Sequence, residues 1–193
     1  MRTAVTKARY RRSGAARLDA GPGSVVGGSV ESSALEQVPA LEGGDAMGEE
    51  ATLGITMDCV DAGLLGRFWA LALGYEEAPP PEGWSTWPDF LTDQGVPEDE
   101  WGDGAAIRPT TGVGPTISFL KVPEPKVVKN RVHLDVKVSG GRNVDPGTRE
   151  RRIRTKEAQL VAAGASTLRE DRVHGDLDHL VMADPEGNEF CIV

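Results

Sequence analysis

The chain has 193 residues and a formal net charge of −9, from 21 Lys and Arg against 30 Asp and Glu. This length suits one domain with a tail, and its apolar runs fall well short of the roughly 20 residues that span a bilayer. The acidic balance disfavours nucleic-acid binding. Two cysteines, Cys59 and Cys191, are too few for a disulfide scaffold or a four-cysteine zinc site. We therefore expect a cytoplasmic protein with reduced thiols that binds neither nucleic acid nor a membrane.

Residues 1–46 differ in composition from the rest of the chain. Residues 1–17 hold six cationic residues and no acidic one, and glycine pairs and serines follow without any apolar periodicity. Such a segment cannot bury enough apolar surface to offset its chain entropy, so we expect a disordered N-terminal extension. It is either an arginine-rich transit peptide or a stretch translated ahead of a true start at Met47. The folded domain is predicted to span residues 47–193.

The first half of this domain begins with an alternating segment at residues 53–59, which predicts a half-buried strand. Asp61 is a helix N-cap candidate, and Gly74 is a good helix stop. Between them, the apolar stripe of the predicted helix consists of Leu64, Leu65, Phe68, Leu71 and Ala72. Residues 75–104 are predicted to be irregular, with a helix start near Pro97, and two strands follow at residues 105–108 and 117–122.

The second half repeats this order. Residues 132–138 alternate like a strand, and Asp145-Pro146 is a strong helix start. One face of this helix carries Ile153, Glu157, Leu160 and Val161, and Gly164 ends it. Three strands follow at residues 165–169, 179–183 and 189–193, with a polar loop at 171–178 and a tight turn at 184–187. Each half therefore consists of a strand, a helix and further strands.

Three segments carry a resemblance to a known family: Asp58 to Asp61 running into Phe68-Trp69 and Leu73 to Tyr75, Val122 to Lys126 leading to Lys129 to Asp135, and Asp184 to Cys191. Together they resemble the glyoxalase-like subgroup of the vicinal oxygen chelate superfamily, which includes glyoxalase I, bleomycin-resistance proteins and extradiol dioxygenases. The resemblance implies an α+β fold of two paired βαβββ modules around a shared cavity. Module one would span residues 52–122, a linker 123–129, and module two 130–193.

The resemblance also implies where a divalent metal would bind, through a His on the first strand and a Glu on the last strand of each module. His133 matches this pattern, but the first-module position falls on Gly54 or Thr56, and the last-strand position falls on Cys191, with Glu189 two residues earlier. The last strand of module one offers no carboxylate. A stable site needs about three protein ligands. We therefore expect no cofactor, although a divalent metal held by His133 and Glu189 remains possible.

The polar sides of the predicted strands suggest a binding pocket. Because side chains alternate along a strand, one pocket is expected to receive His133, Asp135, Thr56, Asp58, Glu189 and Cys191. The two aspartates would form an acid–base pair, accept hydrogen bonds from a cationic ligand, or pair with nearby cations. Two loop aromatics, Trp84 and Trp87, either cover a ligand as a lid or anchor the loop.

These features favour a metal-free small-molecule-binding protein, taking a cationic or polar ligand as in bleomycin-type sequestration. The alternative is a lyase, isomerase or dioxygenase that uses a divalent metal, or His133 with the aspartates, on a small substrate. An interaction domain without a ligand is a third hypothesis, and both a monomer and a homodimer fit. The cations of residues 149–156 are predicted to form a solvated helix face that pairs with Glu150 and Glu157.

Overall fold

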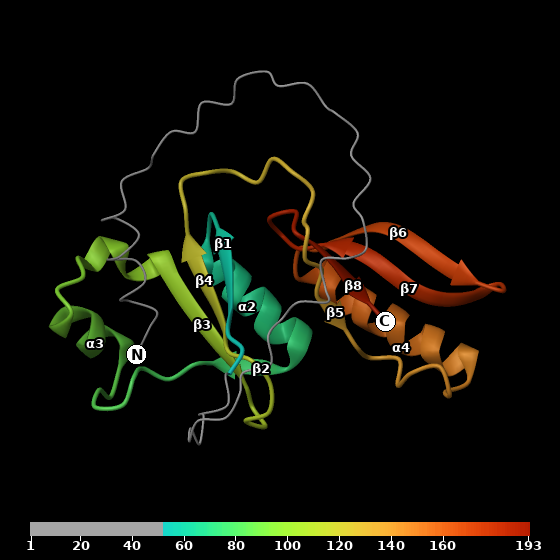
Figure 1. Ribbon diagram of the computed structural model, residues 1–193, viewed down its shortest axis with the longest axis horizontal. Coiled ribbons are helices and arrows are strands. Elements are labelled where there is room, and N and C mark those ends of the chain that lie inside the picture. The colour runs from blue at the N-terminus through green and yellow to red at the C-terminus, as the bar shows by residue number, and fades with distance from the viewer. Residues whose placement is uncertain (1–51) are drawn as a thin grey trace, which may run out of the picture. The chain divides into compact units, whose positions relative to one another are not determined.

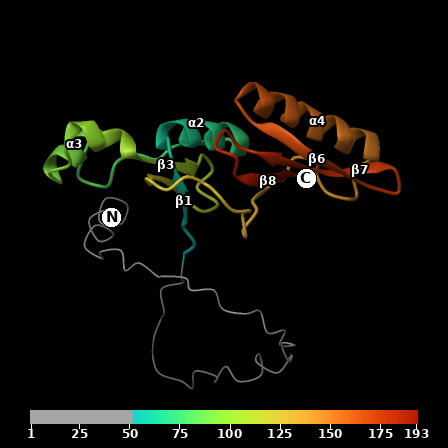
Figure 2. The same ribbon diagram turned by 90° about the horizontal axis from the view of Figure 1, so that it is seen from above.

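The computed structural model describes residues 52–193, so the predicted N-terminal extension of residues 1–46 lies outside the described residues. The described part forms two four-stranded sheets, and helices α2 and α4 lie on the same side of these sheets (Figures 1 and 2). The predicted α+β fold of two βαβββ modules is confirmed. No helix within residues 52–193 combines the length and apolar composition needed to cross a membrane.

Module one follows its local sequence signals closely. It comprises β1 (Ile55–Cys59), α2 (Ala62–Leu73), β2 (Tyr75–Glu77), α3 (Trp87–Asp93), a 3-10 helix (Glu98–Asp103), β3 (Gly104–Pro109) and β4 (Ile117–Lys121). The strand order is β1-β4-β3-β2, with β1 and β4 parallel. The Asp61 side chain accepts a hydrogen bond from the Leu64 backbone N–H at 2.8 Å, and Gly74 ends α2 in the left-handed conformation, at φ 69°.

Two predictions for module one are corrected. Leu71 is 41% exposed, whereas Trp69 is buried, so the buried stripe of α2 is rotated relative to the predicted one. Residues 75–104 are not wholly irregular, because Tyr75–Glu77 pairs with β3 and residues 87–93 form α3. Pairing with a strand that lies some 30 residues further along leaves little local signal, which explains the missed β2.

Module two comprises β5 (Asp135–Val136), α4 (Pro146–Ala162), β6 (Ser166–Val173), β7 (Asp176–Ala183) and β8 (Glu189–Ile192). Its sheet order, β5-β8-β7-β6, repeats that of module one. Asp145 caps α4 by accepting a hydrogen bond from the Thr148 backbone N–H at 2.8 Å, as its sequence position predicts. The buried side of α4 is carried by Ile153 and Leu160, whereas Val161 is exposed.

Strand lengths in module two differ from the predicted ones. β5 is shorter than residues 132–138, and Val132 at its predicted start is 74% exposed. β6 and β7 are longer, so the predicted polar loop is the end of a hairpin that turns at His174 and Gly175. His174 has a φ of 53°, a conformation that a tight turn demands and few non-glycine residues adopt.

The turn before β8 joins the two modules. The Glu186 carboxylate accepts hydrogen bonds from the backbone N–H groups of Val60 and Asp61, at 2.8 and 2.7 Å. Buried Asp184 accepts a hydrogen bond from the Trp69 indole N–H at 3.2 Å. The Trp69 and Phe190 rings lie 5.2 Å apart between centroids, so aromatic packing continues across the junction. Modules one and two therefore share one hydrophobic core.

Candidate functional site

The second sheet has one buried face and one open face. On β8, Phe190 and Ile192 are fully buried, so the alternating Glu189 and Cys191 side chains lie on the face opposite α4. The strand register extends this open face across the sheet. Cys191 is paired with Asp135 on β5 and with Val181 on β7, and Val181 is paired with Arg169 on β6.

A three-residue polar cluster occupies one end of this face. The His133 Nε2 atom lies 3.2 Å from the Glu189 Oε2 atom, and the Lys129 ammonium donates a hydrogen bond to the same oxygen at 2.5 Å. This hydrogen bond is the main cause that lowers the pKa of Glu189, so the carboxylate stays ionised. The structure thus brings together His133 and Glu189, and it adds Lys129 to them.

Cys191 lies in the middle of the open face as a free thiol. Burial raises its pKa, and the carboxylates of Asp135 and Asp171 act in the same direction, whereas Arg169 opposes them. A thiol with a raised pKa is mostly protonated at neutral pH, and the thiolate is the nucleophilic form. Cys191 and Asp135 therefore offer hydrogen bonding to a ligand rather than nucleophilic attack.

His179 lies on the same open face, because it alternates with Leu180 and is paired with Asp171 on β6. Its Nε2 atom lies 3.1 Å from an Asp171 oxygen, and its Nδ1 atom lies 3.0 Å from an Asp178 oxygen. The register between β7 and β8 is needed to see that His179 and Cys191 lie on the same face of the sheet. Lys129 lies in the linker, where no periodic pattern in the sequence marks it as a site residue.

The first-module candidates lie on the other sheet. Thr56 and Asp58 are exposed on β1, opposite Ser118 and Leu120 of β4. Within residues 52–193, no hydrogen bond or ion pair joins Thr56 or Asp58 to the cluster of Lys129, His133 and Glu189. Their sharing of one pocket with the second-module residues stays a prediction.

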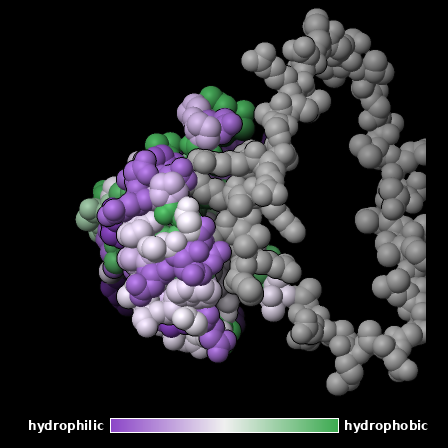
Figure 3. All heavy atoms as spheres, turned by 90° about the vertical axis from the view of Figure 1, so that its left-hand side faces the viewer, coloured by the Kyte–Doolittle hydropathy of each residue, from purple (hydrophilic) through white to green (hydrophobic). Residues whose placement is uncertain are grey.

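The loop aromatics pack against one another. The Trp84 and Trp87 rings lie 5.1 and 5.8 Å from the Phe90 ring, and the Trp87 indole N–H donates to the Ala78 carbonyl at 2.8 Å. The outer surface at this end of the domain is largely hydrophilic (Figure 3). This packing anchors the loop, and the predicted contact of Trp84 and Trp87 with a ligand stays a prediction.

The donors on the open face do not fit the metal site that the resemblance implies. No group of three or more His, Cys, Asp or Glu side chains is arranged to hold a metal ion in the described part of the chain. Of the two matching donors, Glu189 already binds the Lys129 ammonium through the oxygen nearest His133. A stable transition-metal site needs about three protein ligands at fixed geometry, so this donor set falls short.

Comparison with known proteins places the chain in a family. The family model of the glyoxalase-like domain matches residues 54–193, and the chain belongs to this family. No curated protein matches the chain.

The chain also aligns with solved structures. A glyoxalase/bleomycin resistance protein/dioxygenase family enzyme from Burkholderia phytofirmans PsJN is 14% identical, with a TM-score of 0.45 over 72% of this chain and 93% of that one. The fosfomycin resistance protein FosX from Listeria monocytogenes is 12% identical, with a TM-score of 0.47 over 75% of this chain and 90% of that one. The hypothetical protein SA1046 from S. aureus is 13% identical, with a TM-score of 0.46 over 75% of this chain and 97% of that one.

Proposed function

We propose that the chain is a small-molecule-binding protein of the glyoxalase-like group and that it holds a polar organic ligand on the open face of the second sheet. The observation that carries this proposal is the cluster of Lys129, His133 and Glu189, beside the Asp135–Cys191 pair. These side chains gather on the face that α4 leaves uncovered. A sheet face lined with several hydrogen-bonding side chains suits a polar ligand that supplies complementary donors and acceptors.

The charges on this face narrow the class of ligand. Among the described residues, Asp135 is the carboxylate of this face that forms no ion pair, because Lys129 pairs with Glu189 and Arg169 pairs with Asp171. His133 both donates and accepts hydrogen bonds. The chain as a whole has a net charge of −9, which favours the approach of a cation. A cationic or amine-bearing organic molecule therefore fits best.

The second candidate function is acid–base catalysis, and the 3.2 Å pairing of His133 with Glu189 favours it. A carboxylate beside an imidazole fixes the orientation of the ring, which positions it for proton transfer to or from a bound substrate. Under this alternative, His133 moves a proton on a bound substrate in a lyase or isomerase reaction. A dioxygenase reaction would require a metal centre, for which the donor set is short.

Native mass spectrometry and elemental analysis of the purified protein test the proposal together. We expect a bound organic molecule, or saturable binding of metal-free bleomycin as a cationic probe, with less than stoichiometric zinc, iron or manganese. His133→Ala is expected to weaken binding about tenfold or more, the loss of a charge-assisted hydrogen bond. His174→Asn is the matched control, since His174 lies at the far hairpin turn and Asn tolerates its positive φ.

Two results would overturn the proposal. Tight stoichiometric metal in protein purified without added metal would favour the metal-dependent enzyme instead. Equal binding by the wild type, His133→Ala and His174→Asn would place the ligand elsewhere on the molecule.

A further inference from the structure

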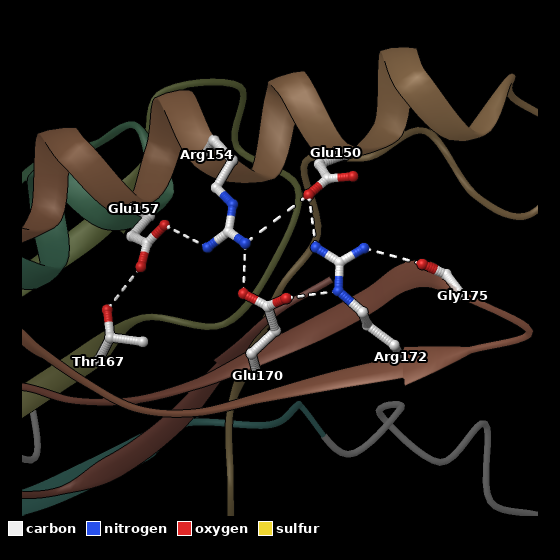
Figure 4. Close-up of polar contacts among 7 residues, drawn as sticks. All are labelled: Glu150, Arg154, Glu157, Thr167, Glu170, Arg172 and Gly175. Atoms are coloured by element: carbon white, nitrogen blue, oxygen red, sulfur yellow. Dashed lines mark hydrogen bonds and ion pairs between the residues drawn. The ribbon is translucent and has the colours of Figure 1, made fainter.

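The cations of α4 fall into two sets that face different surroundings. Arg154 reaches toward β6, where it pairs with Glu157 at 3.0 Å and with Glu170 (Figure 4). Arg149 approaches Asp178 on β7 at 3.9 Å. Arg154 thus pairs with Glu150 and Glu157 as predicted, whereas Arg149 is only 11% exposed and approaches Asp178, so the prediction of a solvated face is wrong for Arg149.

The second set lines an open groove of about 460 Å³ on another side of α4, formed by Val138, Arg151, Arg152, Thr155, Lys156 and Gln159. No carboxylate forms an ion pair with Arg151, Arg152 or Lys156 among the described residues. The charge of Arg151 helps to lower the pKa of Asp145, but it is the smallest of the causes, and the hydrogen bonds from Thr148 are the largest. The groove therefore holds three cations and lacks a lining carboxylate.

Uncharged groups hold these cations in place. The Arg152 Nη1 atom donates to the Ser139 carbonyl at 2.9 Å, and Arg151 donates to the Thr148 hydroxyl at 3.1 Å. Lys156 donates to the Leu71 carbonyl of α2 at 3.2 Å and to the Gln159 side-chain oxygen at 3.0 Å. Such contacts orient the side chains without cancelling their charge, and a preorganised site loses less entropy when it binds.

Lys156 illustrates the uncompensated charge. Partial burial lowers its pKa, and no carboxylate acts in the opposite direction. Gly140 makes the arrangement of Arg152 possible, because a Cβ atom at this position would lie 2.6 Å from the Arg152 Nη1 atom. Gly140 also has a φ of 86°, which other residues rarely adopt.

We propose that this groove is a binding site for a small polyanion that carries phosphate or carboxylate groups. Guanidinium groups bind both kinds of group through paired hydrogen bonds, and the lysine adds a point charge. The groove is wide enough for an organic anion larger than a single phosphate. It lies along α4, whereas the site of the proposed function lies on the sheet face opposite α4, so the two sites are separate.

Isothermal titration calorimetry of the full chain tests this inference, with pyrophosphate and citrate as probes at low salt. We expect saturable one-to-one binding of at least one probe, with a Kd below about 1 mM. Arg152→Gln and Lys156→Gln are each expected to weaken binding about tenfold, as loss of one charge-assisted contact does. Arg67→Gln, which removes an exposed cation of α2 outside the groove, is expected to leave binding unchanged.

The comparison of the two probes identifies the chemical group that the groove prefers. The melting temperature of each variant shows whether its fold is intact, and Lys156→Gln serves if Arg152→Gln unfolds. Absence of saturable heat with both probes up to about 5 mM would overturn the inference. Equal weakening by Arg67→Gln would also overturn it, because that result indicates attraction by overall charge alone.

Discussion

The two cysteines differ in burial because they occupy different positions in the fold, and this difference should give their thiols different reactivity. Cys59 is 3% exposed at the end of β1, where burial, reinforced by the charges of Glu186 and Asp58, raises its pKa to about 12. Cys191 is only partly buried on the open face of the second sheet. Cys59 thus lies on the buried side of the half-buried strand that the alternation of residues 53–59 predicts. Cys191 shares the less buried side of β8 with Glu189, as their spacing of two residues predicts.

Alkylation of the native protein should therefore be selective. We expect iodoacetamide at pH 8 to modify Cys191 slowly and to leave Cys59 unmodified, because only exposed thiolate reacts. Peptide mapping by mass spectrometry measures both sites, and protein in denaturant, where both thiols react, is the control. Equal rates at the two native cysteines would contradict this prediction.

Among the secondary-structure elements, α4 and β6 are tied by a network of ion pairs (Figure 4). Glu170 on β6 contacts both Arg154 and Arg172, and Glu150 on α4 contacts the same two arginines. Isolated surface pairs contribute little to stability, but shared partners restrain one another. The network thus fixes the helix above the strand while leaving the groove cations unpaired.

The stability that Glu170 contributes should depend on pH. Hydrogen bonds from Arg154 and Arg172 lower the pKa of Glu170 in the folded state. Its contribution is therefore present above the pKa of the unfolded state and is lost as the pH falls through the lower folded-state value. Between about pH 5 and pH 3, the melting temperature of the wild type should fall more steeply than that of Glu170→Gln.

Glu124→Gln, which changes an exposed glutamate of the linker, is the control for this experiment. Its melting temperature should follow the wild-type pH dependence. Parallel curves for Glu170→Gln and the wild type would show that the network does not stabilise the folded state.

The elements that the sequence predicts best are those with a local cause. Asp61, Gly74 and Asp145 mark helix ends through hydrogen bonds within a few residues, and the structure has each of them. In contrast, β2 and the length of β5 depend on partners far along the chain. The candidate site is also predicted only in part. The alternation of side chains along a strand predicts that His133 and Glu189 lie on one face, but no local pattern predicts that Lys129 joins them.

At the scale of the whole molecule, Glu186 in the turn before β8 connects the two modules through two hydrogen bonds, beside the one that Asp184 accepts from Trp69. Glu186→Ala removes both hydrogen bonds to the start of α2. We expect a loss of about 1–2 kcal/mol in the free energy of unfolding, as for removal of a helix cap. Urea unfolding followed by tryptophan fluorescence measures it. Glu82→Ala, in an exposed loop, is the control, and an equal effect of both changes would deny Glu186 this role.

The shared core predicts that the two modules unfold together. Phe190 of module two packs on Phe68 and Trp69 of module one, with ring centroids 5.9 and 5.2 Å away. Differential scanning calorimetry should show one transition, and Phe190→Leu should lower its midpoint without splitting it, at a cost of about 1–1.5 kcal/mol. Two resolved transitions in either protein would mean that the modules are thermodynamically independent.

The contact between Glu186 and the start of α2 also has a consequence during protein synthesis. Glu186 follows Val60 by 126 residues. At about 5–20 residues per second, a ribosome needs about 6–25 seconds to make that stretch. Throughout this interval, the nascent first module lacks the carboxylate that binds the Val60 and Asp61 backbone N–H groups, and it lacks the Phe190 ring that packs on Trp69. The first module therefore leaves the apolar surface around Phe68 and Trp69 uncovered until β8 has been made.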